Sequence, residues 1–187
     1  LVPEDEQLLF YGLHVLAAAR DTAIWLRLVD ILKLPDADID RTFSDGAVET
    51  LARLILSCLA DEPTELLARV TDPDVGWHAR WALFQSIARL AIDGCIDRAL
   101  VADTLSRFER EEMADEDSLA WIGWIHAMSH AGLADLEPAL RRVWQKRVCA
   151  QHTEADRAET LRILAAAVAD PGDSHELDRH GIRAIDD

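Results

Sequence analysis

Apolar residues recur at intervals of three and four along most of this 187-residue chain. The first two stripes consist of Leu8, Leu9, Leu13, Leu16 and Ala17, and of Ile24, Leu28, Ile31 and Leu32. Such spacing gathers apolar side chains on one face of an α-helix, whereas a half-buried strand alternates every second residue. Runs of β-branched residues that alternate with polar ones are almost absent. The chain is therefore predicted to be all-helical.

Helix boundaries follow from these stripes and from the six prolines, which all lie at or near predicted helix ends, where proline costs least. The predicted helices span residues 5–20, 22–33, 46–60, 63–70, 75–92, 97–112, 117–131, 136–149 and 154–169. Residues 36–45, which include four aspartates, are expected to form a polar connection. Residues 170–187 are expected to be a polar, flexible tail in which one turn near Ile182 to Ile185 docks back.

The predicted helices come in pairs that repeat along the chain. Each of four segments contains a long helix, a short turn with an aspartate and a second helix. The turn aspartates are Asp21, Asp61, Asp93 and Asp135, so successive turns are 40, 32 and 42 residues apart. A period of about 40 residues built from helix pairs is typical of HEAT and armadillo repeats, which stack to share one core. We therefore expect residues 1–169 to form one α-solenoid of antiparallel helix pairs, with about four repeats plus a C-terminal helix.

Two stretches resemble known families. The segment Leu66–Leu83, LLARVTDPDVGWHARWAL, resembles the HEAT consensus, in which a helix ending in leucine leads through an Asp-Pro turn into a second helix. The stretch LVPEDEQLLFYGLHVLAAARDTAIWLRLVDILKLP, with the Ala-Leu-rich pair after it, resembles a bacterial family of HEAT-like proteins called domain of unknown function 1186. This resemblance extends from about Pro3 to Val148 and implies the solenoid fold. It implies no metal role, because the cysteine-rich SEC-C motif of some members is absent, and no catalytic residues.

The charge and cysteine content narrow the classes of partner and compartment. The chain has 19 Lys and Arg against 35 Asp and Glu, a net charge of −16. Such a surface repels phosphate backbones and anionic lipids, so we expect neither nucleic acid nor membrane as a partner. No apolar run has the length of about 20 residues that a membrane span needs. Three isolated cysteines without a CxxC pair indicate a reducing, cytoplasmic compartment.

The sequence contains no recognisable catalytic motif. It has no GxSxG, no GxGxxG, no glycine-rich phosphate loop and no Cys-His-Asn grouping. His126 and His130 are four residues apart in the sequence HAMSH, which lacks the glutamate base of a zinc-protease HExxH motif. We therefore expect no metal and no cofactor, and we expect a binding protein rather than an enzyme.

A predicted binding surface lies on the second helices of the pairs, which line the concave face of HEAT-like stacks. The charged residues on these helices, here called the arginine face, are Arg27, Asp30, Glu65, Arg69, Asp103, Arg107, Arg141 and Arg142. Five arginines among eight residues suit an acidic peptide. The alternative is that they are solvated positions with intrahelical ion pairs.

Two further groups of residues have open interpretations. The acidic block around residues 109–117 is either a solvated turn or a docking patch for a basic partner. The tryptophan pairs Trp77 with Trp81 and Trp121 with Trp124 have helical spacing, which favours packing in the core, with one indole left for a binding groove.

Together these observations predict a non-catalytic scaffold that binds a partner protein or peptide through its concave face. The alternatives are a HEAT-like lyase acting on bilin chromophores, or another small-ligand-binding protein. A HEAT-like DNA glycosylase is disfavoured by the charge of −16.

Overall fold

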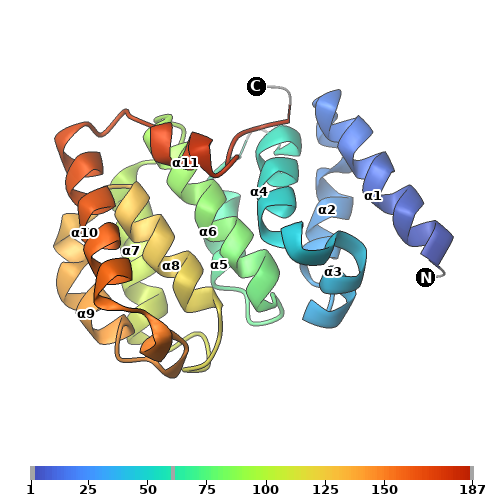
Figure 1. Ribbon diagram of the computed structural model, residues 1–187. Helices are drawn as coiled ribbons and strands as arrows, with labels where there is room; N and C mark the ends of the chain where they lie inside the picture. Colours follow the sequence, from blue (N-terminus) through green and yellow to red (C-terminus); the bar gives the residue numbers. More distant parts are fainter. Residues whose placement is uncertain (1–2, 60–61, 186–187) are drawn as a thin grey trace.

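The computed structural model describes residues 3–59 and 62–185, and within these ranges every regular element is a helix (Figure 1). The α-helices are α1 (Pro3–Ala18), α2 (Trp25–Leu32), α3 (Asp36–Phe43), α4 (Ala47–Cys58), α5 (Glu65–Val70), α6 (Trp77–Ile92), α7 (Arg98–Arg110), α8 (Ala120–His130), α9 (Glu137–Val143), α10 (Glu154–Ala169) and α11 (His175–Arg179). Four 3-10 turns supplement them: η1 (Thr22–Ile24), η2 (Ser44–Gly46), η3 (Ala134–Leu136) and η4 (Arg147–Gln151). The prediction of an all-helical chain is confirmed.

The helices pack in two adjoining rows. Helices α4, α6, α8 and α10 lie side by side in one row, with α1 packed against α4. Helices α5, α7 and α9 form the second row, in which each helix contacts the next one along. The two rows meet where α5 contacts α6 and α7 contacts α8. This arrangement gives both faces of α6 and α8 a neighbour, which explains why their sequences are apolar on nearly every side.

Large aromatic side chains occupy the middle of the core. Trp121 and Trp124 of α8 are fully buried, and their indole Nε1 atoms donate to the carbonyl oxygens of Asp115 and Leu105, both at 2.9 Å. Gly123, between them, faces α6 so closely that a Cβ atom there would lie 2.8 Å from the Cα of Trp81. A glycine at this position therefore allows α6 and α8 to approach each other.

The predicted polar connection at residues 36–45 is wrong, because most of it forms the helix α3. The segment has only two large apolar residues, Ile39 and Phe43, which are four apart and both buried. One turn of spacing is too short to register as a helical period among four aspartates. Tertiary packing of these two side chains therefore determines the local structure.

The C-terminal tail is also ordered over residues 170–185, here called the C-terminal strap. It contains the short helix α11 and crosses the ends of α8, α6 and α4 (Figure 1). Leu177, Ile182 and Ile185 are buried, and the backbone amide of Ile185 donates to the Ser57 hydroxyl at 2.8 Å. These few apolar residues are spaced without a period, so the sequence pattern gives only the docking turn near Ile182.

No helix among the described residues is long and apolar enough to cross a membrane.

Candidate functional site

The arginine face is distributed over α2, α5, α7 and α9. The last three of these helices are consecutive neighbours in one row, and α2 joins them through a 3.0 Å hydrogen bond from Trp25 Nε1 to Glu65 Oε2. The structure therefore brings the predicted residues onto adjoining helices.

Every arginine of this face has a carboxylate partner within the chain. Four pairs lie within one helix or at its end: Arg27 with Asp30 at 3.7 Å, Arg69 with Glu65 at 2.5 Å, Arg107 with Glu111 at 3.4 Å and Arg141 with Glu137 at 2.5 Å. Arg142 of α9 makes a two-pronged contact with Glu109 of α7, at 2.7 and 2.8 Å. The arginine charges are therefore balanced locally, as the alternative interpretation of these residues requires.

The ion pairs also change the titration of their members. The hydrogen bonds from Arg69 and then from Trp25 lower the pKa of Glu65. The hydrogen bonds to Glu109 raise the pKa of Arg142. Asp103 is exposed and has no cation within ion-pair distance among residues 3–59 and 62–185. Because the guanidinium groups already have acceptors, an acidic peptide would have to displace carboxylates of the chain itself.

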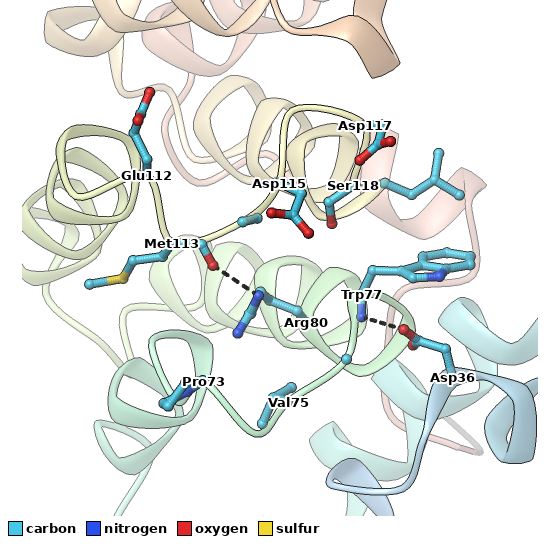
Figure 2. Close-up of a pocket in the computed structure, with 13 residues that line it drawn as sticks. Asp36, Pro73, Val75, Trp77, Arg80, Glu112, Met113, Asp115, Asp117 and Ser118 are labelled. Atoms are coloured by element: carbon cyan, nitrogen blue, oxygen red, sulfur yellow. Dashed lines mark hydrogen bonds between the residues drawn. The ribbon is translucent and has the colours of Figure 1, made fainter.

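A hollow of the surface lies away from this face, at the N-terminal ends of α6 and α8 (Figure 2). We call it the Trp77 groove; its volume is about 640 Å³, and it is lined by Asp36, Pro73, Val75, Gly76, Trp77, Arg80, Glu112, Met113, Ala114, Asp115, Asp117, Ser118 and Leu119. The lining comes from the first residue of α3, the loop between α5 and α6, the start of α6, and the loop between α7 and α8.

Asp36 shapes one end of the groove by capping α6. Its carboxylate accepts hydrogen bonds from the backbone amides of Trp77 and His78, both at 3.2 Å, which satisfies two donors that a helix start leaves unpaired. The His78 ring lies between Asp36 and Asp40, at 3.0 Å from one carboxylate and 2.7 Å from the other. A Cβ on Gly76 would lie 2.5 Å from Asp36 Oδ1, so only glycine leaves room for this cap.

Arg80 forms the floor of the groove (Figure 2). The side chain is 7% exposed, and its two terminal nitrogens donate to the carbonyl oxygens of Asp72 at 2.7 Å and Met113 at 3.1 Å. Its guanidinium also lies over the Phe108 ring, 5.5 Å from the centroid. Burial lowers the pKa of Arg80, and its Nε has no acceptor among the described residues. Arg80 therefore joins the two loops that border the groove and leaves one buried donor unsatisfied.

The rim of the groove is acidic. Glu112 pairs with Lys146 at 3.0 Å, and Asp117 pairs with Arg147 at 3.5 Å. The Asp115 carboxylate is exposed and has no cation or hydrogen-bond donor among the described residues. The rim therefore retains negative charge after all its ion pairs are counted.

A second hollow also has Trp77 in its lining. This indole pocket, of about 270 Å³, is lined by Asp40, Ser44, Ala47, Val48, Glu49, Trp77, His78 and Trp81. The Trp77 ring stacks on His78 with 3.4 Å between centroids and is 6.4 Å from the Trp81 ring. Glu49 is exposed and has no ion pair within the described part of the chain. The linings of the two hollows thus share Trp77 and together contain several carboxylates and two half-buried indoles.

Three histidines, His126, His130 and His180, lie close together toward the C-terminal end of α8. The rings of His126 and His130 are 6.0 Å apart, and His180 of the strap lies 6.3 Å from His130. Burial lowers the pKa of His126 to about 3 and that of His130 to about 4. Among the residues that the structure describes, no group of three or more His, Cys, Asp and Glu side chains is arranged to hold a metal ion.

The cysteines and the first helix complete the set of candidate positions. Cys58 and Cys149 are buried, and burial raises the pKa of each thiol to about 11, which makes both poor nucleophiles. The outer face of α1 is apolar and exposed at Leu8, Tyr11 and Val15, with exposed fractions of 70%, 64% and 68%. Neither feature has the polar groups that a catalytic site requires.

Sequence reasoning missed three key members of the groove, namely Asp36, Trp77 and Arg80. Asp36 was assigned to a polar connection and Trp77 to the core, and Arg80 was noted only within the HEAT-like segment. The signal that was available is the acidic block at residues 109–117, whose interpretation as a docking patch includes Glu112, Asp115 and Asp117.

Comparison with known proteins gives no further guide: no family model, no curated protein and no solved structure matches the chain.

Proposed function

We propose that the chain is a non-catalytic interaction module, an α-solenoid of HEAT-like helix pairs that binds a segment of a partner protein. The two adjoining rows of helices support the solenoid, because successive members of one row are connected through a helix of the other. In repeat proteins of this kind each pair contacts only its neighbours, and the stack offers extended surfaces for partners.

The observation that carries the proposal is the Trp77 groove. It is open to solvent, about 640 Å³ in volume, and bordered by two loops that Arg80 holds together from below. A half-buried tryptophan beside such a hollow is the type of residue that anchors partner segments at interfaces. We therefore propose the groove as the binding site in preference to the arginine face, whose guanidinium groups already have carboxylate partners.

A small organic ligand is the second candidate, and the volume of the groove favours it. Pockets for small molecules span roughly 300–1,000 Å³. Such pockets are mostly apolar, however, whereas this groove has four carboxylates in its lining. Thermal-shift measurements with tetrapyrroles test this candidate, including the lyase alternative, and a stabilisation that Asp115→Lys removes would favour it.

Selection from a displayed library of random peptides on the immobilised chain tests the interaction module. We expect binders that are lost with the groove variant Asp115→Lys and kept with the arginine-face variant Arg107→Glu. Both substitutions reverse one exposed charge, so they form a matched pair. Absence of any enriched peptide would contradict the proposed function. Loss of binding with Arg107→Glu alone would instead assign the site to the arginine face.

A further inference from the structure

The Trp77 groove and the indole pocket share one side chain, and their lining suggests the chemistry of the partner. Trp77 lines both hollows, so the two hollows adjoin at this residue. Trp81 lies behind it, 6.4 Å away between centroids. Indole faces attract ammonium and guanidinium groups, and an exposed contact of this kind contributes about 0.5–1 kcal/mol.

The carboxylates around these indoles outnumber the cations. Asp36, Glu112, Asp115 and Asp117 line the groove, and Asp40 and Glu49 line the pocket. Arg80 is the one cation in the two linings, and it is buried beneath the groove with its terminal nitrogens engaged by carbonyl oxygens. With a net charge of −16 on the whole chain, the field over this surface attracts cations and repels anions.

At the floor of the groove Arg80 lacks one hydrogen-bond acceptor, which a cation without oxygen atoms does not provide. Arg80 is 93% buried, and its Nε is a donor without an acceptor among the described residues. A buried donor in this state costs about 1–3 kcal/mol, and a carbonyl oxygen of a bound segment would recover this once the side chains that cover the Nε move apart. Peptide backbone provides such an oxygen at every residue, whereas a metal ion or a polyamine provides none.

We propose that this surface binds a lysine- or arginine-rich segment of a partner protein. The basic side chains pair with Asp115 and Glu49 and lie against the faces of Trp77 and Trp81, and a backbone carbonyl of the segment faces Arg80. This inference rests on the proposed function and specifies the chemistry of the partner at the same site.

The test is a titration of the full chain with a lysine-rich Gly-Ser peptide and with its glutamate and serine counterparts, followed by fluorescence anisotropy. We expect the lysine peptide to bind at low ionic strength, and its affinity to fall about tenfold between 50 and 200 mM salt, because exposed charges are screened. The glutamate and serine peptides are not expected to bind.

Variants of the chain connect this binding to the surface. Asp115→Asn with Glu49→Gln removes two exposed carboxylates that have no ion pair, so the fold is preserved, and we expect at least tenfold weaker binding of the lysine peptide. Asp103→Asn removes one exposed carboxylate from the arginine face and is the matched control, expected to bind as the native chain does.

The outcomes separate the two proposals. If the random library yields binders but the lysine peptide does not bind, or binds the double variant as well as the native chain, the basic-segment inference is overturned and the interaction module stands. If spermine binds as tightly as the lysine peptide, the inference is also overturned, because a peptide backbone is then not recognised. If no peptide of any composition binds, both proposals fail.

Discussion

The two ends of helices α6 and α8 differ in whether another segment of the chain covers them. At their C-terminal ends the strap of residues 170–185 covers the edge, and Arg89 of α6 holds it through Asp178 at 2.6 Å and the carbonyl of Ile182 at 3.2 Å. At their N-terminal ends no segment of residues 3–59 or 62–185 covers the Trp77 groove, which is open to solvent.

This difference is the reason why we propose the groove edge as the site for a partner. At both edges the chain itself provides hydrogen-bond partners for helix ends or loop carbonyls. At the groove edge Asp36 caps the start of α6, and Arg80 donates to two loop carbonyls. At the strap edge Arg89 donates to the carbonyl of Ile182. Among the described residues, the groove edge combines a hollow of about 640 Å³ with a carboxylate that has no ion pair, Asp115, and with the half-buried indole of Trp77, whereas the hollow lined by the strap residues Asp173, Glu176 and Leu177 is much smaller. We therefore expect substitutions at the strap edge to change stability alone, and substitutions at the groove edge to separate into structural and binding effects.

The largest effect is expected at the floor of the groove. Arg80→Ala removes a buried side chain and leaves the carbonyls of Asp72 and Met113 without their donor, which should lower the free energy of unfolding by about 4 kcal/mol. Denaturation with urea measures this. The matched control is Arg141→Ala, an exposed ion pair within α9, for which we expect a change below about 0.5 kcal/mol. Equal effects of the two substitutions would show that Arg80 does not hold the loops.

The strap edge should respond next. Leu177 is 2% exposed, so Leu177→Ala should cost about 3 kcal/mol of unfolding free energy if the strap folds together with the rest. Peptide binding by the folded variant should be unchanged, because the groove lies at the other edge. Leu161→Ala on α10, where the side chain is 36% exposed, serves as the control and should lower the free energy of unfolding by about 0.5 kcal/mol. Unaltered stability of Leu177→Ala would mean that the strap contributes nothing to the fold.

Acid should weaken the strap edge before the groove edge. Burial lowers the pKa of His130 from 6.5 to about 4, with His180 lowering it further and Glu176 of the strap opposing the shift. Below pH 6.5 the His130 imidazole therefore binds a proton in the unfolded chain, whereas in the folded chain it stays neutral down to about pH 4. The free energy of unfolding is therefore highest above pH 6.5 and decreases as the pH falls toward 4. At pH 5 the contribution of His130 to this decrease is about 2 kcal/mol.

Unfolding measured from pH 7.5 to pH 4.5 tests this dependence. His130→Phe should flatten the part of the curve that His130 causes, while the buried His126, whose pKa is lowered to about 3, preserves a slope of the same sign. A native chain whose stability is constant over this range would contradict the assignment.

The smallest effect concerns the cap of α6. Asp36→Ala removes the acceptor for the amides of Trp77 and His78 and should cost about 1 kcal/mol, whereas Asp36→Asn keeps an acceptor and should cost less. Gly76→Ala should resemble Asp36→Ala, because its Cβ would displace the carboxylate. If Gly76→Ala is neutral in urea denaturation, the close approach of Asp36 does not limit this turn.

The sequence predicts the helices with long apolar stripes and fails where a few contacts decide. The predicted spans 75–92 and 154–169 agree closely with α6 and α10, because α6 is apolar over four turns and α10 begins at a capping box of Thr153 and Asp156. Helix α3 depends on Ile39 and Phe43 alone, and α11 on Leu177, so neither produces a period. The arrangement of the helix pairs as a solenoid remains a proposal.

The candidate site was predictable only in part. The acidic block at residues 109–117 was visible in the sequence, because clustered carboxylates form a local pattern, but that pattern left a solvated turn and a docking patch both open. Asp36 lies 41 residues before Trp77 in the chain, so a pattern of neighbouring residues does not predict that it caps α6. The arginine face was visible as spacing, but four of its five arginines pair with a carboxylate three or four residues away, and Arg142 pairs with Glu109 of another helix.

Hydrogen exchange of the full chain, with and without a saturating peptide selected from the random library, tests the contrast between the two edges most directly. The account predicts slower exchange of backbone amides in the loops at residues 72–78 and 111–119, and no change in the strap at residues 170–185. Protection confined to the strap, or to the arginine face on α5, α7 and α9, would contradict it.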